Sequence, residues 1–221
     1  ANTTLTSTGN GNVTFDADVD TLGGSPFNLS INTGSGNYFQ DNPSSQLITN
    51  GGNLTISASD VDLRGTINTG TGRVTFEQTL AGSEIALGSD AGTLSLSDAE
   101  LDRVTTSQGI AIGNTDSGDI RILEAISPAN SPAMFLTTGG KVLNETPGAL
   151  LDVANLSLSA EQGIGNTGPV NIAVDNAVAI ETLFGTVDVF SPQDITVGAV
   201  DGIVGVTAAG GINIEADGDV T

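Results

Sequence analysis

Apolar and polar residues alternate along most of this chain. In "VTFDADVD" the apolar residues Val13, Phe15, Ala17 and Val19 take every second position, and polar residues fill the others. The same alternation recurs in "NLTISAS", "RVTFEQ", "TLSLSD", "NLSLSA" and "GINIEADGDV". Successive side chains of a strand point to opposite faces. The pattern therefore predicts many short strands, each with one buried face and one wet face.

The spacing of these runs adds a repeat. Leu54, Val74 and Leu94 each open a run directly after a glycine-containing turn, and they lie 20 residues apart. Looser copies open at Ile120, Val142, Val170, Val187 and Ile212. Strand-rich repeats of roughly 20 residues, punctuated by glycine, are typical of a solenoid in which successive coils stack.

We therefore predict an all-β fold, a right-handed parallel β-helix of about ten coils, with residues 1–221 as a single domain. A β-sandwich also has frequent strands and turns, but it does not require a fixed register. At about 4.8 Å per coil the rod would be on the order of 50 Å long. The stretches Tyr38–Gln46 and Ser127–Met134 look like insertions at corners.

Two near-identical phrases, "INTGSG" from Ile31 and "INTGTG" from Ile67, indicate corners of the coil. Glycine accepts positive φ without steric cost, and asparagine tolerates it better than most residues. A corner asparagine can also bond to the coils above and below it. A phosphate-binding loop would need a Gly-Lys-Ser/Thr ending and a following helix, and neither is present.

One segment departs from the strand pattern. Ser97 and Glu100 have the spacing of a capping box, and Leu101 with Val104 could cover one helical turn. We expect a short helix or 3₁₀ turn at a corner here.

The composition excludes several classes of partner and of catalytic site. The 26 acidic residues outnumber five basic ones, which gives a formal net charge of −21. Nucleic acids and anionic membrane surfaces both require a basic footprint, so neither is an expected partner. The chain has no His and no Cys, which excludes Ser-His-Asp catalysis, disulfides and zinc sites built on these ligands. No apolar stretch is long enough to span a bilayer.

Carboxylate pairs are the remaining candidates for chemistry. A glycosidase needs two facing carboxylates, and three pairs have a suitable i, i+2 spacing: Asp16 with Asp18, Asp60 with Asp62, and Asp98 with Glu100. A solvated acidic face is the simpler interpretation. We therefore predict that the chain is not an enzyme, with no catalytic and no cofactor-binding residues.

Calcium is the one cofactor left open. "DADVD" at Asp16–Asp20 resembles the start of an EF-hand loop, but Thr21 and Phe27 stand where that loop needs glycine and glutamate. A looser site between coils near Asn114–Asp119 remains an alternative. No metal-binding residue is predicted.

Several phrases resemble the β-strand repeats of giant bacterial surface proteins, the filamentous-haemagglutinin-like exoproteins and large autotransporter adhesins. They are "VDLRGTINTGTGRVTF" (Val61–Phe76), "TLSLSDAELDRVTTSQGIAIGNTDSGDIRILEAISPA" (Thr93–Ala129), "LLDVANLSLSAEQGIGNTG" (Leu150–Gly168) and "DITVGAVDGI" (Asp194–Ile203). "DNPSS" at Asp41–Ser45 does not match the Asn-Pro-Asn-Gly motifs of the secretion domain of such proteins. The resemblance implies a stalk or passenger segment outside a bacterial cell.

Three functions follow from these observations. The first is a structural or adhesive extracellular rod, a segment of a longer repeat protein or a subunit that stacks end to end on itself. The second is a module that binds a glycan or protein through a corner loop such as Tyr38–Gln46. The third is a polysaccharide-active enzyme.

Overall fold

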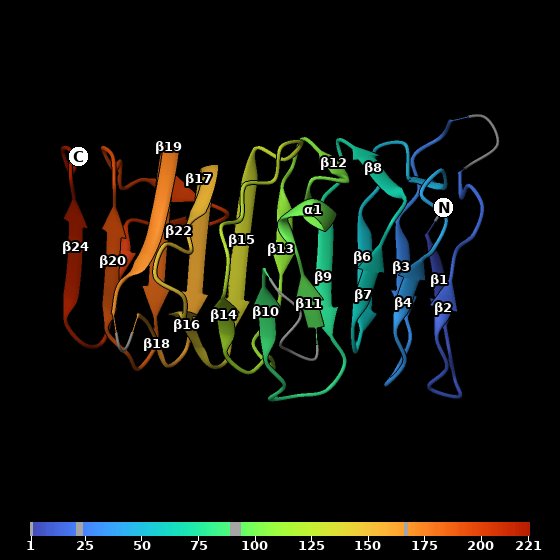
Figure 1. Cartoon of the computed structure of the whole chain (residues 1–221), viewed down its shortest axis with the longest axis horizontal. Helices are drawn as coiled ribbons and strands as arrows, with labels where there is room; N and C mark the ends of the chain where they lie inside the picture. Colours follow the sequence, from blue (N-terminus) through green and yellow to red (C-terminus); the bar gives the residue numbers. More distant parts are fainter. Residues whose placement is uncertain (1, 21–23, 89–93, 166–167) are drawn as a thin grey trace.

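The chain winds into a rod of stacked parallel strands (Figure 1). The computed structural model describes residues 2–20, 24–88, 94–165 and 168–221, and these form a β-solenoid of about nine coils. This confirms the predicted right-handed parallel β-helix of about ten coils. The elements are β1 (Thr3–Thr6), β2 (Val13–Thr14), β3 (Leu29–Asn32), β4 (Tyr38–Gln40), β5 (Gln46–Ile48), β6 (Leu54–Ala58), β7 (Val61–Leu63), β8 (Thr66–Gly70), β9 (Val74–Gln78), β10 (Ile85–Leu87), β11 (Leu94–Leu96), α1 (Asp98–Leu101), β12 (Val104–Thr106), β13 (Ile110–Ile112), β14 (Ile120–Ile122), β15 (Ala133–Thr138), β16 (Lys141–Asn144), β17 (Leu151–Ala160), β18 (Gly163–Ile164), β19 (Val170–Thr182), β20 (Val187–Ser191), β21 (Ala199–Val200), β22 (Ile203–Val204), β23 (Val206–Thr207) and β24 (Ile212–Ala216).

Each coil contributes to three faces. Face A runs through β1, β3, β6, β9, β13, β15, β17, β19 and β23, and we number coils 1 to 9 by these strands. Face B contains β2, β4 and β7, then β11, β10, β14, β16, β18, β20 and β24. Face C contains β5, β8 and β12, and continues through 151–153 of β17 and 172–174 of β19.

The core consists of inward-facing side chains stacked in columns. On face A one column runs from Leu29 through Leu54, Val74, Ile110, Met134 and Leu156 to Val178. All of these side chains are buried. Because each rung repeats the apolar positions of the last, every coil between the two ends buries its inner face against two neighbours.

The predicted register is right for two of its three members and wrong for the third. Leu54 and Val74 pair directly on face A, but the next partner of Val74 is Ile110, 36 residues on. Leu94 lies on face B and pairs with Ile85. The glycine turn predicted before Leu94 falls at 91–93, outside the described residues.

The long coil between Val74 and Ile110 contains an additional strand. β11 follows β10 in sequence, yet it lies between β7 and β10 in space (Figure 1). It is fixed to coil 3 by Ser95, whose backbone N–H and hydroxyl both donate to the Asp60 carboxylate, at 3.0 and 3.1 Å. This extra strand and α1 account for the departure from a 20-residue repeat.

The predicted corners are confirmed at both Asn-Thr-Gly phrases. Gly34 and Gly70 have φ of 61° and 58°, which favours glycine. In each turn the buried threonine hydroxyl donates to a glycine carbonyl three residues on, from Thr33 and from Thr69, at 2.6 Å. The two phrases do not stack, because one ends a face A strand and the other a face C strand. They are therefore two copies of one local turn.

Two other expectations are corrected. Tyr38–Gln46 is not an inserted loop, since Tyr38 and Gln40 belong to β4 and are fully buried. "VTFDADVD" is not one strand: β2 ends at Thr14, and Val19 bridges to Leu47 on another face. Apolar alternation continued across a corner and so looked like one strand.

The predicted helix is present as α1, with the Ser97–Glu100 capping box formed. Leu101, the last residue of α1, and Val104, the first of β12, are both fully buried. No helix among the described residues is long and apolar enough to cross a membrane.

A small hairpin lies outside the rod. β21 and β22 are antiparallel and leave coil 9 between Val197 and Val206. Val200 and Ile203 pack on the outer surface of face A, in a cluster separate from the core.

Candidate functional site

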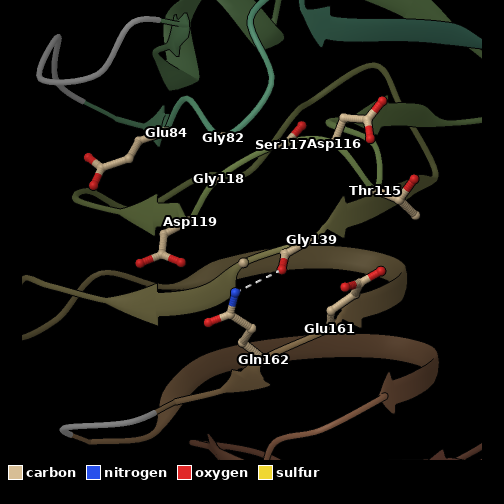
Figure 2. A pocket seen from close by; sticks show the side chains of 11 residues that line it. Gly82, Glu84, Thr115, Asp116, Ser117, Gly118, Asp119, Gly139, Glu161 and Gln162 are labelled. Carbon is tan, nitrogen blue, oxygen red and sulfur yellow. Dashed lines mark hydrogen bonds between the residues drawn. The ribbon is translucent and has the colours of Figure 1, made fainter.

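An acidic groove lies at the corner between faces A and B (Figure 2). It has a volume of about 490 Å³ and crosses coils 4 to 7. Glu84, Asp116, Asp119 and Glu161 supply four carboxylates to its lining. We call this hollow the acidic groove.

Two glycines form its floor. At Gly139 and Gly140 the chain turns from β15 to β16, while coils 5 and 7 carry side chains on either side. A Cβ on Gly139 would collide with the Thr115 carbonyl oxygen, and one on Gly140 with the Asp119 carboxylate. Coil 6 therefore needs glycine at this corner to approach coil 5, and the missing side chains leave the hollow.

Hydrogen bonds between coils hold the groove walls. Asp119 accepts the Lys141 backbone N–H through Oδ1 at 2.8 Å. The Gln162 side chain donates from Nε2 to the Gly139 carbonyl at 3.2 Å, as drawn in Figure 2. Asp119 and Gln162 thus join neighbouring coils, so these two polar groups are part of the scaffold.

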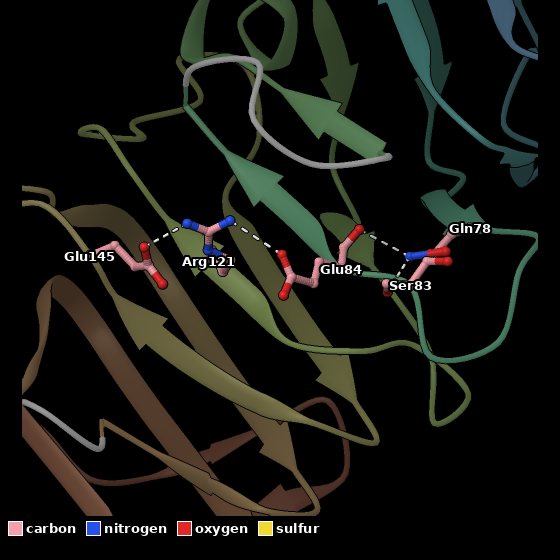
Figure 3. Close-up of polar contacts among 5 residues, drawn as sticks. All are labelled: Gln78, Ser83, Glu84, Arg121 and Glu145. Atoms are coloured by element: carbon pink, nitrogen blue, oxygen red, sulfur yellow. Dashed lines mark hydrogen bonds and ion pairs between the residues drawn. The ribbon is translucent and has the colours of Figure 1, made fainter.

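An ion-pair network borders the groove on face B (Figure 3). The Arg121 guanidinium lies 3.2 Å from a Glu84 oxygen and 2.6 Å from a Glu145 oxygen. Gln78 donates to the carbonyls of Ser83 and Glu84 and so fixes the backbone that carries Glu84. Three successive coils are connected by this network.

The network shifts the pKa values of Arg121 and Glu145. The hydrogen bond from Arg121 holds the pKa of the Glu145 carboxyl below its ordinary range. The hydrogen bond to Glu145, with a smaller contribution from Glu84, raises the pKa of Arg121. Both side chains are partly solvated, so this pair contributes modestly to stability.

Carboxylates of all three predicted pairs have partners within the fold. Asp60 accepts two bonds from Ser95, while Asp62 forms an ion pair with Arg64 at 3.1 Å. Asp98 and Glu100 lie on α1, the predicted helical turn. Residues two apart on a helix do not face each other.

Asp98 and Glu100 have structural partners instead. Asp98 accepts the Ser127 backbone N–H at 2.6 Å. Glu100 completes the capping box and accepts the Leu63 backbone N–H at 3.0 Å. The pair therefore joins α1 to the coils on either side.

The Asp16–Asp20 stretch also serves coil stacking. Asp18 accepts the Gln46 N–H at 2.9 Å, and Asp20 accepts from the Asn50 side chain at 2.6 Å. Asn114–Asp119 forms a compact turn in which the Asn114 side chain accepts the Asp116 N–H at 2.9 Å. Within the described ranges no three acidic side chains gather closely enough to hold a metal ion. That the chain takes no cofactor stays a prediction.

Two features of the surface were missed from the sequence. The groove depends on "TTGGK" at 137–141, where paired glycines sit at a corner between long apolar runs. The hairpin depends on Asp201–Gly202 between Val200 and Ile203, which is a strong hairpin signal. Both signals lie within stretches that also fit the strand-and-turn repeat, so the repeat pattern alone does not distinguish them.

Exposed apolar side chains lie at the same corner. Leu80 in coil 4 and Leu183 with Phe184 in coil 8 are more than half exposed. Leu183 borders a second hollow beside Glu161 and Glu181. The corner therefore combines acidic and apolar groups along one edge of the rod.

Comparison of the chain with models of protein families, with curated proteins and with solved structures found no match.

Proposed function

We propose that this chain is a structural or adhesive rod from a bacterial cell-surface or secreted protein. The observation that supports it most is the stack of inner columns, which continues through about nine coils. Eight spacings of about 4.8 Å give a rod on the order of 40 Å along its axis. The resemblance to exoprotein and adhesin repeats favours an extracellular setting.

The mechanism is reach combined with limited lateral association. Strands hydrogen-bond from coil to coil, so the backbone bonds run along the axis and resist stretching. The net charge of −21 opposes side-by-side contact between rods. A spacer with these properties holds whatever it carries at a fixed distance.

The two ends of the rod suggest its partner. Leu5 in coil 1 and Ile212 and Val220 in coil 9 belong to inner columns, yet they are 40, 50 and 51 % exposed. Strand edges at both ends lack a described neighbour. We infer that further coils cover them, either from a longer parent chain or from a second copy stacked end to end.

A one-coil deletion tests the rod. Ala133 pairs with Asn155, so removing residues 134–155 joins equivalent positions of coils 6 and 7. We expect a folded protein whose scattering profile keeps its cross-section while its length falls by about 4.8 Å. Loss of the folded state would contradict a modular spacer. Beads coated with the full chain or with the deletion variant are then presented to cells. Attachment of the beads to the cells would indicate an adhesive rod, and no attachment a passive one.

A binding module is the second candidate, and the acidic groove supports it. The carboxylates of Glu84, Asp116 and Glu161 line the groove and can accept hydrogen bonds from hydroxyls or basic side chains. Glycan and basic-peptide arrays probed with the wild type and with the variant Asp116→Asn/Glu161→Gln test this. Binding that is lost in the variant would favour the module, whereas an absence of binding in both favours the rod. That the chain is not an enzyme stays a prediction, checked by turnover assays on polysaccharides.

A further inference from the structure

The hairpin of coil 9 is a separate appendage on the rod. It leaves at Gly198 and returns at Gly205, and the Gly205 N–H donates to the Gly198 carbonyl at 2.7 Å. Its tip is Asp201–Gly202, with φ of 51° and 85°, the geometry of a tight two-residue turn. Val206 resumes face A immediately afterwards by pairing with Ile180.

The hairpin packs on coils that are distant from its own. Val200 is 7 % exposed and lies in a cluster with Ala133 and Phe135 of coil 6 and Ala179 of coil 8. Ile203 and Ala111 of coil 5 are partly buried against this cluster. The outer surface of face A that the hairpin covers is mostly apolar, with the buried Ser157 between Phe135 and Ala179.

An arginine from coil 4 holds the hairpin tip. Arg73 donates from Nη1 to Asp201 Oδ2 at 3.1 Å and from Nη2 to Oδ1, across 128 residues of sequence. The same guanidinium lies 4.3 Å from the centre of the Phe135 ring. Gly109 of coil 5 makes room for this ring, because a Cβ there would collide with it. We call the contacts of Arg73 with Asp201 and Phe135 the clamp.

These contacts differ from the rest of the fold. In a solenoid each coil normally touches only its neighbours, so stability is nearly a sum of adjacent terms. The hairpin instead connects coil 9 with coils 8, 7, 6, 5 and 4. Arg73 is the only cation on the outer surface of face A within the described residues, so an acidic hairpin tip has one defined attachment point.

We propose that the hairpin is a strap that couples coil 9 to coil 4 and is released when the clamp opens. While the clamp is formed, coils 4 to 9 unfold locally as one cooperative unit. When the clamp is broken, coil 9 unfolds locally without coil 4. The strap rests on contacts within the chain and holds whether or not the rod is a stalk.

Hydrogen exchange followed by mass spectrometry tests the strap in the full chain. Two charge reversals, Arg73→Glu and Asp201→Arg, each place like charges at the clamp. We expect the rate of amide exchange in the hairpin, Gly198–Gly205, to rise about tenfold in either variant. We also expect the amides of coil 9 to exchange faster than those of coil 4 in these variants. Arg64→Glu is the matched control, because it reverses a charge in another exposed ion pair, with Asp62.

Two further samples complete the test. The double variant Arg73→Glu/Asp201→Arg restores opposite charges and should recover much of the wild-type protection. Unchanged exchange in both single variants would overturn the strap. So would recovery of protection at twice the mass on mixing the two single variants, because the hairpin would then act between molecules.

Discussion

Asn28 and Asn53 occupy the same corner of successive coils, and the Asn28 side-chain oxygen accepts the Asn53 backbone N–H at 2.9 Å. The Asn53 side-chain oxygen in turn accepts the Arg73 N–H at 2.9 Å. Each asparagine thus satisfies a corner amide of the next coil, which the strand pairing on the faces cannot reach.

Removing one step of this asparagine ladder should destabilise the fold. We expect Asn53→Ala to lower the free energy of unfolding by about 1 kcal/mol, because the Arg73 amide loses its acceptor. Urea unfolding measures the change. Asn53→Asp keeps an acceptor oxygen and should cost less. Equal losses in the two variants would show that the accepted bond is not the cause.

The inner columns predict a contrast between two phenylalanines. Phe76 is fully buried in a second face A column, between Ile56 and Ile112, whereas Phe184 is 72 % exposed at a corner. We expect Phe76→Ala to cost about 3 to 5 kcal/mol through lost burial and a cavity. Phe184→Ala should change stability by less than about 0.5 kcal/mol. Thermal unfolding of both variants checks this, and similar losses would contradict the placement of the core.

The floor of the acidic groove predicts a contrast between two glycines. A Cβ at Gly140 meets Asp119 atoms of coil 5, while one at Gly211 meets nothing within 4 Å. We expect Gly140→Ala to cost about 1 to 3 kcal/mol. Gly211→Ala should be neutral or stabilise by up to about 1 kcal/mol. The denaturant midpoints of the two variants are compared with that of the wild type. Equal midpoints in both variants would show that this corner does not require glycine.

The Arg121–Glu145 pair predicts a pH dependence. Because the folded pKa of Glu145 is lowered, its contribution is complete above the ordinary glutamate pKa and is lost as pH falls through the folded value. The stability difference between wild type and Glu145→Gln should therefore shrink between neutral pH and about pH 3. Glu124→Gln, on the same side of the rod, is the control. A difference that grows on acidification would contradict the lowered pKa.

The fold was largely predictable because its determinants are local and repeated. Alternation at Leu54–Ala58 and Val74–Gln78 specifies which side chains face inward, and the Asn-Thr-Gly turns specify where the coil bends. Leu94 was misplaced because a fixed spacing was extended into a coil that contains an extra strand. No local pattern distinguishes a new strand on face B from the next rung of face A.

The candidate site was less predictable because it depends on the relation between coils. The acidic groove needs Asp119 of one coil beside Gly140 of the next, and a repeat pattern does not specify how corners of unequal length align. Arg73 and Asp201 meet only after five coils have stacked. The sequence carries the Asp-Gly turn of the hairpin, but not the surface on which the hairpin lies.

The position of β11 has a consequence for the order in which the molecule assembles. β10 precedes β11 in the chain, yet β11 occupies the place next to β7. Growth of the rod from its first coil therefore cannot proceed strictly in the order of synthesis. The edge of β7 stays uncovered until β11 is in place, so we expect the addition of coils to pause at coil 4 until α1 and β11 have docked.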